Sequence, residues 1–232
     1  MNAADRDPVD VLVVGAGLAG HTAALVAAQN GASVLLVEKG REYGGSSIMA
    51  GGGLVFAGTD LQRAAGIVDT KEALRDDQVA TGRGAADEAI IDAFVDNQLE
   101  TFEWLRSVGV EMSLEDRRTP GDVVRVHFTG LGAATHRLHE LALAHPLVTY
   151  RASLAAGRLH QDVQGRVIGV TTAEQELLGA LRGVVLTTGG FSRSHDLLQR
   201  FAPQCSTAAP LGGKHNTGDG IRMAWAAGAG VV

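Results

Sequence analysis

A glycine motif between an apolar strand and an alanine-rich helix is the strongest constraint on how this chain folds. The segment VDVLVVGAGLAG, residues 9–20, contains Gly15, Gly17 and Gly20 in the spacing G-x-G-x-x-G. The residues HTAALVAAQNG that follow predict a helix ended by Gly31, and ASVLLVEKG predicts a second buried strand. A strand, a helix and a strand within about 30 residues predict a right-handed parallel βαβ unit. We therefore expect an α/β fold with a mostly parallel central sheet.

A dinucleotide-binding turn uses each of these glycines in a different way. The first makes the tight turn, the second lets the backbone approach a pyrophosphate, and the third lets the helix pack closely on the sheet. The N-terminus of the helix directs free N–H groups and the positive end of its dipole toward the phosphates. Glu38 ends the next strand at about the 20-residue distance that ribose-binding carboxylates have in such folds. A carboxylate there accepts hydrogen bonds from the ribose hydroxyls and disfavours NADP, and the alternative is a solvated turn at Glu38 and Lys39.

Composition and charge exclude several other classes of protein. The 232 residues include 31 glycines and 5 prolines, and glycine at about twice its usual share indicates many tight turns. A net charge of −6 without a block of Lys or Arg argues against a nucleic-acid partner. No apolar run approaches the ~20 residues that span a bilayer, and the polar, acidic N-terminus is not a secretory signal. With Cys205 as the single cysteine, we expect a cytoplasmic protein that contacts no membrane.

Hydrophobic periodicity predicts further elements along the chain. Residues 69–108 are expected to be helical, and five apolar side chains in this span recur near the spacing of one buried helix face. They are Ile90, Phe94, Leu99, Phe102 and Leu105. The later pattern predicts helices at 133–145 and 194–202, strands between 147 and 172 with a turn at Gln164 and Gly165, and a strand from 182. The segment 115–130 is interpreted as a loop with a short strand, and GAGVV at 228–232 as the start of a strand.

The glycine fingerprint alone does not separate FAD from NAD, so later segments decide. Residues 38–58, EKGREYGGSSIMAGGGLVFAG, are too apolar for a linker and too rich in glycine for a helix. Such a segment is expected to stay near the ligand and to line a second, flat group. Two further glycine turns, TTGGF at 187–191 and NTGDG at 216–220, each adjoin a regular element. An NAD-binding module remains the alternative at this point.

The chain resembles the fumarate reductase, succinate dehydrogenase and 3-ketosteroid dehydrogenase family of FAD-dependent oxidoreductases. The resemblance is carried by VVGAGLAG, VEKG, GGSSIMAGGG, VVLTTGGF and TGDGIRMAWAAGA, in family order and over nearly the whole chain. It is greatest to the soluble fumarate reductase and ketosteroid dehydrogenase branch. It implies a Rossmann-like FAD-binding domain over residues 1–232, with a mainly helical excursion over 60–145.

The resemblance also implies which residues bind FAD. They are Gly15, Gly17, Ala19, Gly20, Glu38, Lys39, Gly45, Ser46, Ser47, Gly51, Gly52, Ala156, Thr188, Gly189 and Asp219. Ala19 and the two serines correspond to positions at the pyrophosphate, and Glu38 to the position at the ribose. Gly51 and Gly52 correspond to positions beside the isoalloxazine, Ala156 to the position at the adenine edge, and Asp219 to the position at the ribityl chain. Membrane-bound relatives carry a histidine joined covalently to the flavin where this chain has Ser46, so we expect non-covalent FAD.

The expected activity is hydride transfer between flavin N5 and a carbon of an activated C–C bond in a small-molecule substrate. In relatives the catalytic acid and base groups follow the TGDG motif, so we expect no catalytic residue in this chain. The substrate-capping domain is expected after residue 232, on a second subunit or on a missing segment. An exposed apolar edge near the C-terminus would be covered by that partner. The alternatives are a truncated fragment and a non-catalytic flavin-binding or assembly subunit.

Several residues that suggest other chemistry have plainer interpretations. Ser194, His195 and Asp196 are consecutive, whereas the members of a hydrolase triad meet in space, so Ser194 is interpreted as a helix N-cap. His136 and His139 stand one helical turn apart, which is a spacing that metals use. Because no third ligand motif accompanies them, we expect no metal site.

Two further sets of residues are left open or set aside. Arg125 and His127 match a basic segment that borders the flavin pocket in relatives, so substrate contact is one interpretation and packing is the plainer one. Cys205 has no C-x-x-C partner, and we expect no redox role for it.

Overall fold

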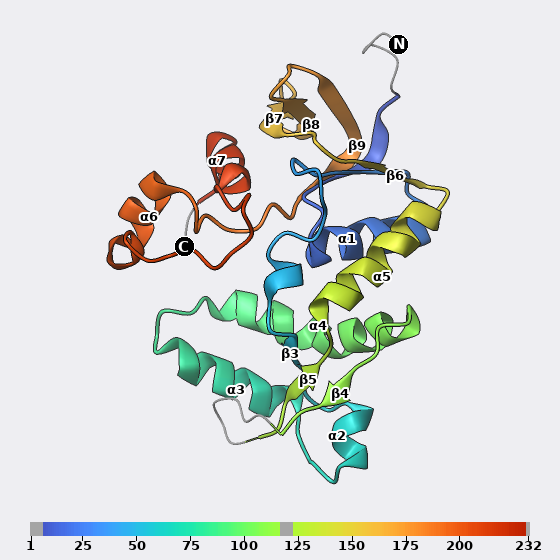
Figure 1. Ribbon diagram of the computed structural model, residues 1–232, viewed down its shortest axis with the longest axis vertical. Coiled ribbons are helices and arrows are strands. Elements are labelled where there is room, and N and C mark those ends of the chain that lie inside the picture. Colours follow the sequence, from blue (N-terminus) through green and yellow to red (C-terminus); the bar gives the residue numbers. More distant parts are fainter. Residues whose placement is uncertain (1–6, 117–122, 231–232) are drawn as a thin grey trace. The chain divides into compact units, whose positions relative to one another are not determined.

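The computed structural model describes residues 7–116 and 123–230, which form two compact units (Figure 1). The first unit comprises residues up to Ala50 and from Leu131 onward, and the second comprises Gly51–Gly130. The predicted βαβ unit is present in the first as β1 (Val9–Val14), α1 (Leu18–Gln29) and β2 (Val34–Val37).

A six-stranded sheet in the order β6-β2-β1-β9-β8-β7 forms the centre of the first unit. Neighbours from β6 to β9 are parallel, whereas β8 pairs antiparallel with both β9 and β7. The strand β9 joins the two parts, because its first residues pair with β8 and its later ones with β1. The expected α/β fold with a mostly parallel sheet is confirmed. The strands not yet given are β6 (Val148–Arg151), β7 (Ala156–Gln161), β8 (Val167–Thr172) and β9 (Leu177–Leu186).

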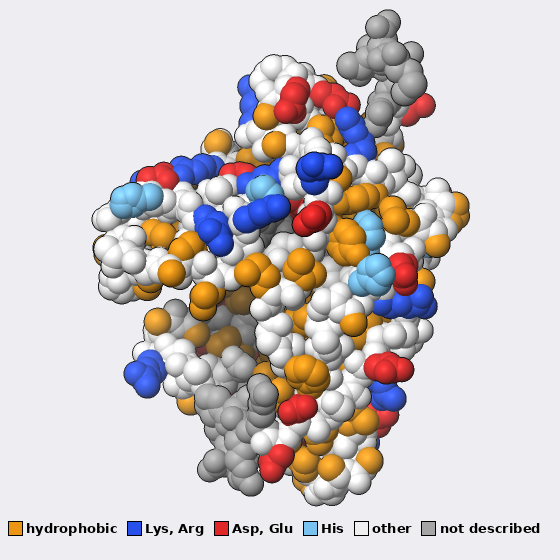
Figure 2. Space-filling view, viewed as in Figure 1, with side chains coloured by type: hydrophobic (Ala, Val, Ile, Leu, Met, Phe, Trp, Pro, Cys, Tyr) orange, Lys and Arg blue, Asp and Glu red, His pale blue; other side chains and the backbone are white. Residues whose placement is uncertain are grey.

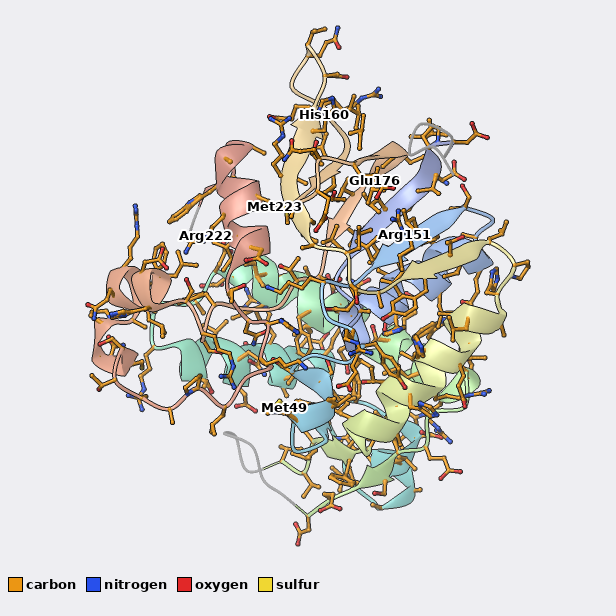
Figure 3. The ribbon with its side chains drawn as sticks, turned by 45° about the horizontal axis from the view of Figure 1, so that its top comes forward. Met49, Arg151, His160, Glu176, Arg222 and Met223 are labelled. Carbon is orange, nitrogen blue, oxygen red and sulfur yellow. The ribbon has the colours of Figure 1, made fainter. Side chains whose placement is uncertain are left out.

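An ion pair joins the edge strand β6 to the turn between β8 and β9. Arg151, at the end of β6, and Glu176, just before β9, point toward each other (Figure 3). Both guanidinium Nη atoms donate to the carboxylate, at 2.9 Å each. A bidentate pair of this kind fixes direction as well as distance. It therefore holds the end of β6 against the turn between β8 and β9.

The central strands are buried on both sides, by α1 on one face and by a cluster that includes Val170 and Leu178 of the antiparallel strands on the other. Val13 and Leu36 pack toward α1, whereas Leu12 and Val37 share a cluster with Met223 of α7. This two-sided burial explains why β1 and β2 have continuous apolar sequences rather than alternating ones. α1 and α5 lie side by side (Figure 1). The helices of this unit after α1 are η1 (Ser47–Met49), α5 (Leu131–Ala144), α6 (His195–Phe201), η2 (Pro203–Cys205) and α7 (Asp219–Ala226).

The second unit combines helices with a small antiparallel sheet in the order β3-β5-β4. The sequence predicted a mainly helical excursion over 60–145. The structure places the compact unit at Gly51–Gly130 and assigns α5, which falls in that range, to the first unit. The elements of the second unit are β3 (Gly53–Val55), α2 (Asp60–Ala64), α3 (Lys71–Gly82), α4 (Glu88–Ser107), β4 (Ser113–Leu114) and β5 (Val126–Phe128).

The predicted buried face of α4 is wrong in its first half. Ile90 and Phe94 are 62% and 42% exposed, whereas Val95 and Gln98 are buried. Phe102 is buried as expected. Leu105 is buried as well, and a row spaced by three to four residues that leads to Phe102 and Leu105 passes through Val95 and Gln98, so Ile90 and Phe94 lie beside it. Gln98 is buried because its amide pairs with both the N–H and the carbonyl of Ala57.

Arg125 and His127 are buried within the second unit. The guanidinium of Arg125 donates twice to Asp69 and also to Asp77. His127 bonds the hydroxyl of Thr59 through Nε2, at 2.8 Å. These contacts satisfy groups that would otherwise be costly to bury, so both residues have a structural role in holding the unit together.

Two of the predicted segments extend beyond the residues that the structure describes. Of the strand expected at 228–232, Gly228–Gly230 are not in a strand, and Val231 and Val232 lie outside the described part. The loop expected at 115–130 includes residues 117–122, which also lie outside it, and its short strand is β5. Within the described residues, no helix combines the length and apolarity needed to cross a membrane.

Candidate functional site

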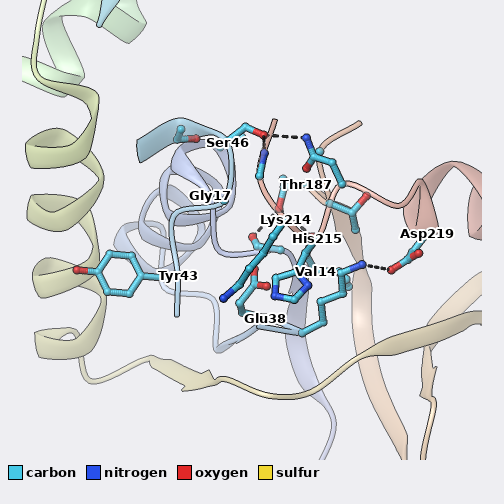
Figure 4. Close-up of a pocket in the computed structure, with 18 of the residues that line it drawn as sticks. Val14, Gly17, Glu38, Tyr43, Ser46, Thr187, Lys214, His215 and Asp219 are labelled. Atoms are coloured by element: carbon cyan, nitrogen blue, oxygen red, sulfur yellow. Dashed lines mark hydrogen bonds and ion pairs between the residues drawn. The ribbon is translucent and has the colours of Figure 1, made fainter. Parts of the chain in front are cut away.

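A cavity of about 500 Å³ lies in the first unit, where β1, β2 and β9 end and α1 begins (Figure 4). Ligand pockets have this size, and open parallel sheets bind ligands outside the carboxyl ends of their strands. Twelve of the residues expected to bind the cofactor line it: Gly15, Gly17, Ala19, Glu38, Lys39, Gly45, Ser46, Ser47, Ala156, Thr188, Gly189 and Asp219. Gly20 lies within α1, and Gly51 and Gly52 belong to the second unit, where their expected approach to a ligand remains a prediction.

The glycine turn at the end of β1 has the geometry that its sequence predicts. Gly15 has a φ of 107°, and a Cβ there would lie 2.5 Å from the carbonyl oxygen of Thr187. A Cβ on Gly20 would lie 1.8 Å from the carbonyl oxygen of Gly15. Side chains are therefore excluded where the turn meets β9 and where α1 meets the turn. Gly17 instead lines the cavity, which leaves its backbone accessible to a ligand.

Glu38 is held by the backbone on both of its carboxylate oxygens. Oε2 accepts from the N–H of Ala16 at 3.0 Å, and Oε1 accepts from the N–H of Gly40 at 2.7 Å. An ionised carboxylate offers about four acceptor positions. Two positions remain for a ligand in the cavity that Glu38 lines. The side chain is thus part of the folded site rather than of a solvated turn.

Ser46 and Ser47 accept hydrogen bonds within the chain, and neither hydroxyl donates to an acceptor among the described residues. The Oγ of Ser47 accepts from the N–H of Leu18 in the first turn of α1, at 3.0 Å. The Oγ of Ser46 accepts from the N–H of Gly213 at 3.0 Å and from the amide of Asn216 at 2.8 Å. A hydroxyl group has one hydrogen to donate in addition to its lone pairs. Both serines line the cavity, so each hydroxyl can donate its hydrogen to a ligand there.

An ion pair joins the end of β2 to the start of α7 beside the cavity. Nζ of Lys39 donates to Asp219 and to Thr217, at 2.6 Å each. Burial opposes the charged form of Asp219, but the hydrogen bonds from Lys39 and Thr217 prevail and hold the pKa of Asp219 below its ordinary value. The carboxylate is therefore ionised at neutral pH, and Figure 4 shows the pair at the edge of the cavity.

The loop 210–216 contributes cavity residues that were not among those expected to bind the cofactor. Gly213, Lys214, His215 and Asn216 all line the cavity. A Cβ on Gly213 would lie 2.9 Å from the carbonyl carbon of Gly45, so the two loops touch through their backbones. The adjacent glycines at 212 and 213 were the available signal for this contact.

Arg193 holds that loop in place. Its Nε donates to the carbonyl oxygens of Gly212 and Gly213, at 3.3 and 3.2 Å, and its own N–H donates to the carbonyl oxygen of Asn216 at 2.9 Å. Arg193 also lines the cavity. Its guanidinium thus satisfies carbonyl groups of a loop that forms no regular structure.

Ser194, His195 and Asp196 do not form a triad. Ser194 occupies the N-cap position of α6, as expected, but its side chain accepts no hydrogen bond from the helix. Its hydroxyl instead donates to Asp196 at 2.7 Å and accepts from Arg222 at 3.0 Å. Within the described residues, no group of three or more His, Cys, Asp or Glu side chains is arranged to hold a metal ion.

Two buried histidines connect α1 to α5 next to the glycine turn. Nδ1 of His21 donates to the carbonyl oxygen of Gly17 at 2.9 Å, because a carbonyl can only accept. In the neutral state Nε2 of His21 therefore accepts from Nδ1 of His139, at 3.0 Å. Burial lowers the pKa of His21 to about 4 and holds the pKa of His139 below its ordinary value.

Lowering the pH from 7 to 5 is expected to reduce the free energy of unfolding by about 2 kcal/mol through His21 alone. The pKa of His21 is about 4 in the folded chain, whereas a freely solvated histidine has a pKa of 6.5. The unfolded chain therefore binds the proton first, so this stabilisation is complete above pH 6.5 and is lost as the pH falls toward 4. The lowered pKa values of His127 and His139 act in the same direction.

Denaturant unfolding at pH 7, 6 and 5 measures this effect in the wild type and in His21→Phe. The variant keeps a ring of similar size but cannot titrate, so its stability is expected to depend less steeply on pH. Equal slopes for the two proteins would contradict the assignment of a low pKa to His21.

The sequence and the fold of this chain are both similar to those of known flavin-dependent proteins. Residues 10–232 match the family described as FAD binding domain. Vinyl phenol reductase of Lactiplantibacillus plantarum is 35% identical over 238 residues, which cover 99% of this chain and 48% of that protein. The fold is similar to the open conformation of a flavocytochrome c3 fumarate reductase, with a TM-score of 0.91 and 28% identity over 98% of this chain and 42% of that one. It is also similar to a 3-ketosteroid dehydrogenase from Rhodococcus jostii RHA1, with a TM-score of 0.86 and 26% identity over 98% of this chain and 55% of that one. The chain thus spans about half the length of these proteins.

Proposed function

Because the chain belongs to the FAD binding domain family, we propose that it is the FAD-binding part of an oxidoreductase that reduces or dehydrogenates an activated C–C bond. FAD is the cofactor of the family. The similar proteins are named as two reductases and a dehydrogenase, which supports the type of reaction. The activity, the substrate and the partners of the whole protein are part of the proposal.

The FAD site is proposed chiefly because the two serines that line the cavity, Ser46 and Ser47, can each donate a hydroxyl hydrogen to a ligand. The hydroxyl oxygen of Ser47 accepts from the first N–H group of α1, and that of Ser46 accepts from two donors. Both hydroxyls are therefore fixed in place, and each can still donate its hydrogen. The first N–H groups of a helix have no acceptor within the helix, and that of Ala19 belongs to this set. Donors gathered at a helix N-terminus suit a pyrophosphate. We assign Ala19, Ser46 and Ser47 to that group.

The remaining parts of FAD are assigned from the same cavity. Glu38, with two free acceptor positions, suits the hydroxyls of the adenosine ribose. Leu154 and Ala156, which line the cavity beside it, suit the adenine. Asp219, ionised and held by Lys39, suits the ribityl hydroxyls. When bound, FAD supplies the hydride chemistry, and the residues of this chain bind and orient it.

An apolar rim supports the proposal that more protein completes the site. Ile48 and Met49 of η1 line the cavity and are 48% and 58% exposed. Figure 3 shows Met49 on this short helix. Exposed apolar side chains at the mouth of a ligand site are typical of a surface that another part of the protein covers. We propose that a further segment or a partner subunit covers them and supplies the catalytic acid and base groups.

Titration of the flavin-free chain with FAD tests the cofactor assignment. We expect one FAD to bind per chain, with a shifted visible spectrum, and NAD to bind at least about a hundredfold more weakly. Because position 46 carries a serine, we expect acid precipitation of the protein to release all of the flavin into solution. Failure to bind FAD would overturn the proposal, and flavin that stays with the precipitate would overturn its non-covalent part.

Reduction by an artificial electron donor tests the enzymatic part. The FAD-loaded chain is assayed with a reduced viologen dye and with 4-vinylphenol or fumarate, alone and together with the remaining part of the protein. Turnover is expected only in the combined preparation, because the acid and base groups are proposed to belong to that remaining part. Turnover in neither preparation would favour a non-catalytic flavin-binding role.

A further inference from the structure

The strongest feature not used by the proposed site is a cluster of rings beside the cavity. Tyr43 stacks on His139 of α5, with ring centroids 3.7 Å apart and planes at 17°. Its ring edge faces His21, at 5.7 Å and 78°, and its hydroxyl bonds Nδ1 of His136 at 2.5 Å. Tyr43 is also one of the residues that line the cavity, and Figure 4 shows its ring pointing toward a helix. Figure 2 shows histidine side chains gathered at the surface over α5.

This cluster is connected to the glycine turn through hydrogen bonds of fixed direction. His139 donates to His21, and His21 donates to the carbonyl oxygen of Gly17. Because Gly17 O can only accept, the tautomer of each neutral ring is determined. The helix α5 is therefore joined by side chains to the central glycine of the turn.

The residues that follow Tyr43 form one wall of the cavity. The N–H of Gly44 donates to the carbonyl oxygen of Ala16 at 2.7 Å, and Ser47 accepts from Leu18. Gly44 and Gly45 have φ values of 104° and 50°. Two successive glycines have many conformations when free, so a wall built on them loses more entropy on ordering than other residues would. A fixed residue immediately before them reduces that loss.

Burial alone does not require these residue types. Tyr43 is only partly buried, and the His136 side chain to which it bonds is 62% exposed. His21 is fully buried, and both of its ring nitrogens have partners. An aliphatic side chain would fill the same space without directing Gly17 or Tyr43. The polar side chains are explained by the direction that their hydrogen bonds impose on Gly17 and Tyr43.

We propose that Tyr43 and His139 are positioning residues that hold the segment 43–47 against the glycine turn, so that FAD meets a wall already ordered by α5. The inference rests on the proposed FAD site. The ordering is then complete before the ligand arrives, and this raises affinity by preorganisation. Tyr43 lines the cavity, whereas His139 is not among the described residues that line it, so the His139 variants separate positioning from direct contact with FAD.

The dissociation constant for FAD, measured with the flavin-free full chain, tests the proposal. Tyr43→Ala and His139→Leu are expected to raise it about tenfold, chiefly through faster release, because segment 43–47 must then be ordered on binding. His139→Asn keeps an N–H near the position of Nδ1 and is expected to restore the affinity to within about threefold of wild type. The control Leu143→Ala changes an exposed residue of the same helix, which is 57% exposed, and is expected to leave the affinity unchanged.

Each outcome bears on the positioning role separately from the FAD site. If the wild type does not bind FAD, the proposed function fails. If the wild type binds and Tyr43→Ala binds equally well, the positioning role is overturned. If His139→Asn is as weak as His139→Leu while both unfold at the same temperature, ring packing rather than the bond to His21 is responsible, and the role given to His139 is overturned.

Discussion

Replacing Gly20 by alanine is expected to abolish measurable FAD binding and to reduce the free energy of unfolding by about 3 kcal/mol. A Cβ at this position would lie 1.8 Å from the carbonyl oxygen of Gly15 and 2.8 Å from Oγ1 of Thr187. The nearer atom belongs to the backbone, so the clash is relieved only if α1 moves away from the glycine turn. That movement displaces the first N–H groups of α1, which the proposed function assigns to the pyrophosphate.

Gly132→Ala is the matched control for this substitution. A Cβ at Gly132 would meet no atom within 4 Å, and the residue lies in α5. Alanine is expected there to raise stability by about 0.5–1 kcal/mol because it favours the helix, with no change in FAD affinity. Denaturant unfolding and FAD titration of both variants measure the two effects. Wild-type FAD affinity in Gly20→Ala would show that the ligand does not lie at this turn.

Glu38→Gln is expected to weaken FAD binding about a hundredfold with a smaller effect on stability. The carboxylate now accepts from the N–H groups of Ala16 and Gly40 through separate oxygens. A glutamine amide has only one oxygen, so its NH₂ group must face one of these donors. The side chain then turns or the backbone shifts, and the acceptors proposed for the ribose hydroxyls are lost together with the negative charge.

Glu42→Gln is the control for this loss of charge. Glu42 lines the same cavity and the substitution removes the same charge, but no ribose contact is assigned to it. We expect its FAD affinity to stay within about threefold of wild type. Calorimetric titration with FAD compares the two variants directly. Equal weakening by both would mean that the net charge of the cavity, rather than the position of Glu38, controls binding.

The sequence predicts those features that depend on neighbouring residues. Gly15 is recognisable because the turn requires a φ of 107°, and Gly20 because a side chain there would meet the carbonyl oxygen of Gly15 in the same turn. β1 and β2 are recognisable because burial on both faces requires uninterrupted apolar residues. The face of α4 was placed less well, since two apolar residues, Ile90 and Phe94, lie just beside the buried row.

The contacts between distant loops had no comparable signal. β9 begins at Leu177, earlier than predicted, because its first residues pair with β8 rather than with β1. Arg193 and the loop 210–216 reach the cavity through carbonyl groups and glycine contacts that leave no periodic pattern. His136 and His139, which the sequence presented as one pair, bond different partners on the same side of α5.

By itself the sequence determined the parallel βαβ unit, the glycine turn and the carboxylate at Glu38, because their signals all lie within one strand–helix–strand segment of about 30 residues. Only the tertiary structure decided which donors those groups meet: Ser46 with Asn216, Lys39 with Asp219, and His21 with His139. Each of these pairs joins residues more than a hundred positions apart. Such distances are closed by the packing of the whole sheet and its helices, which no local pattern encodes.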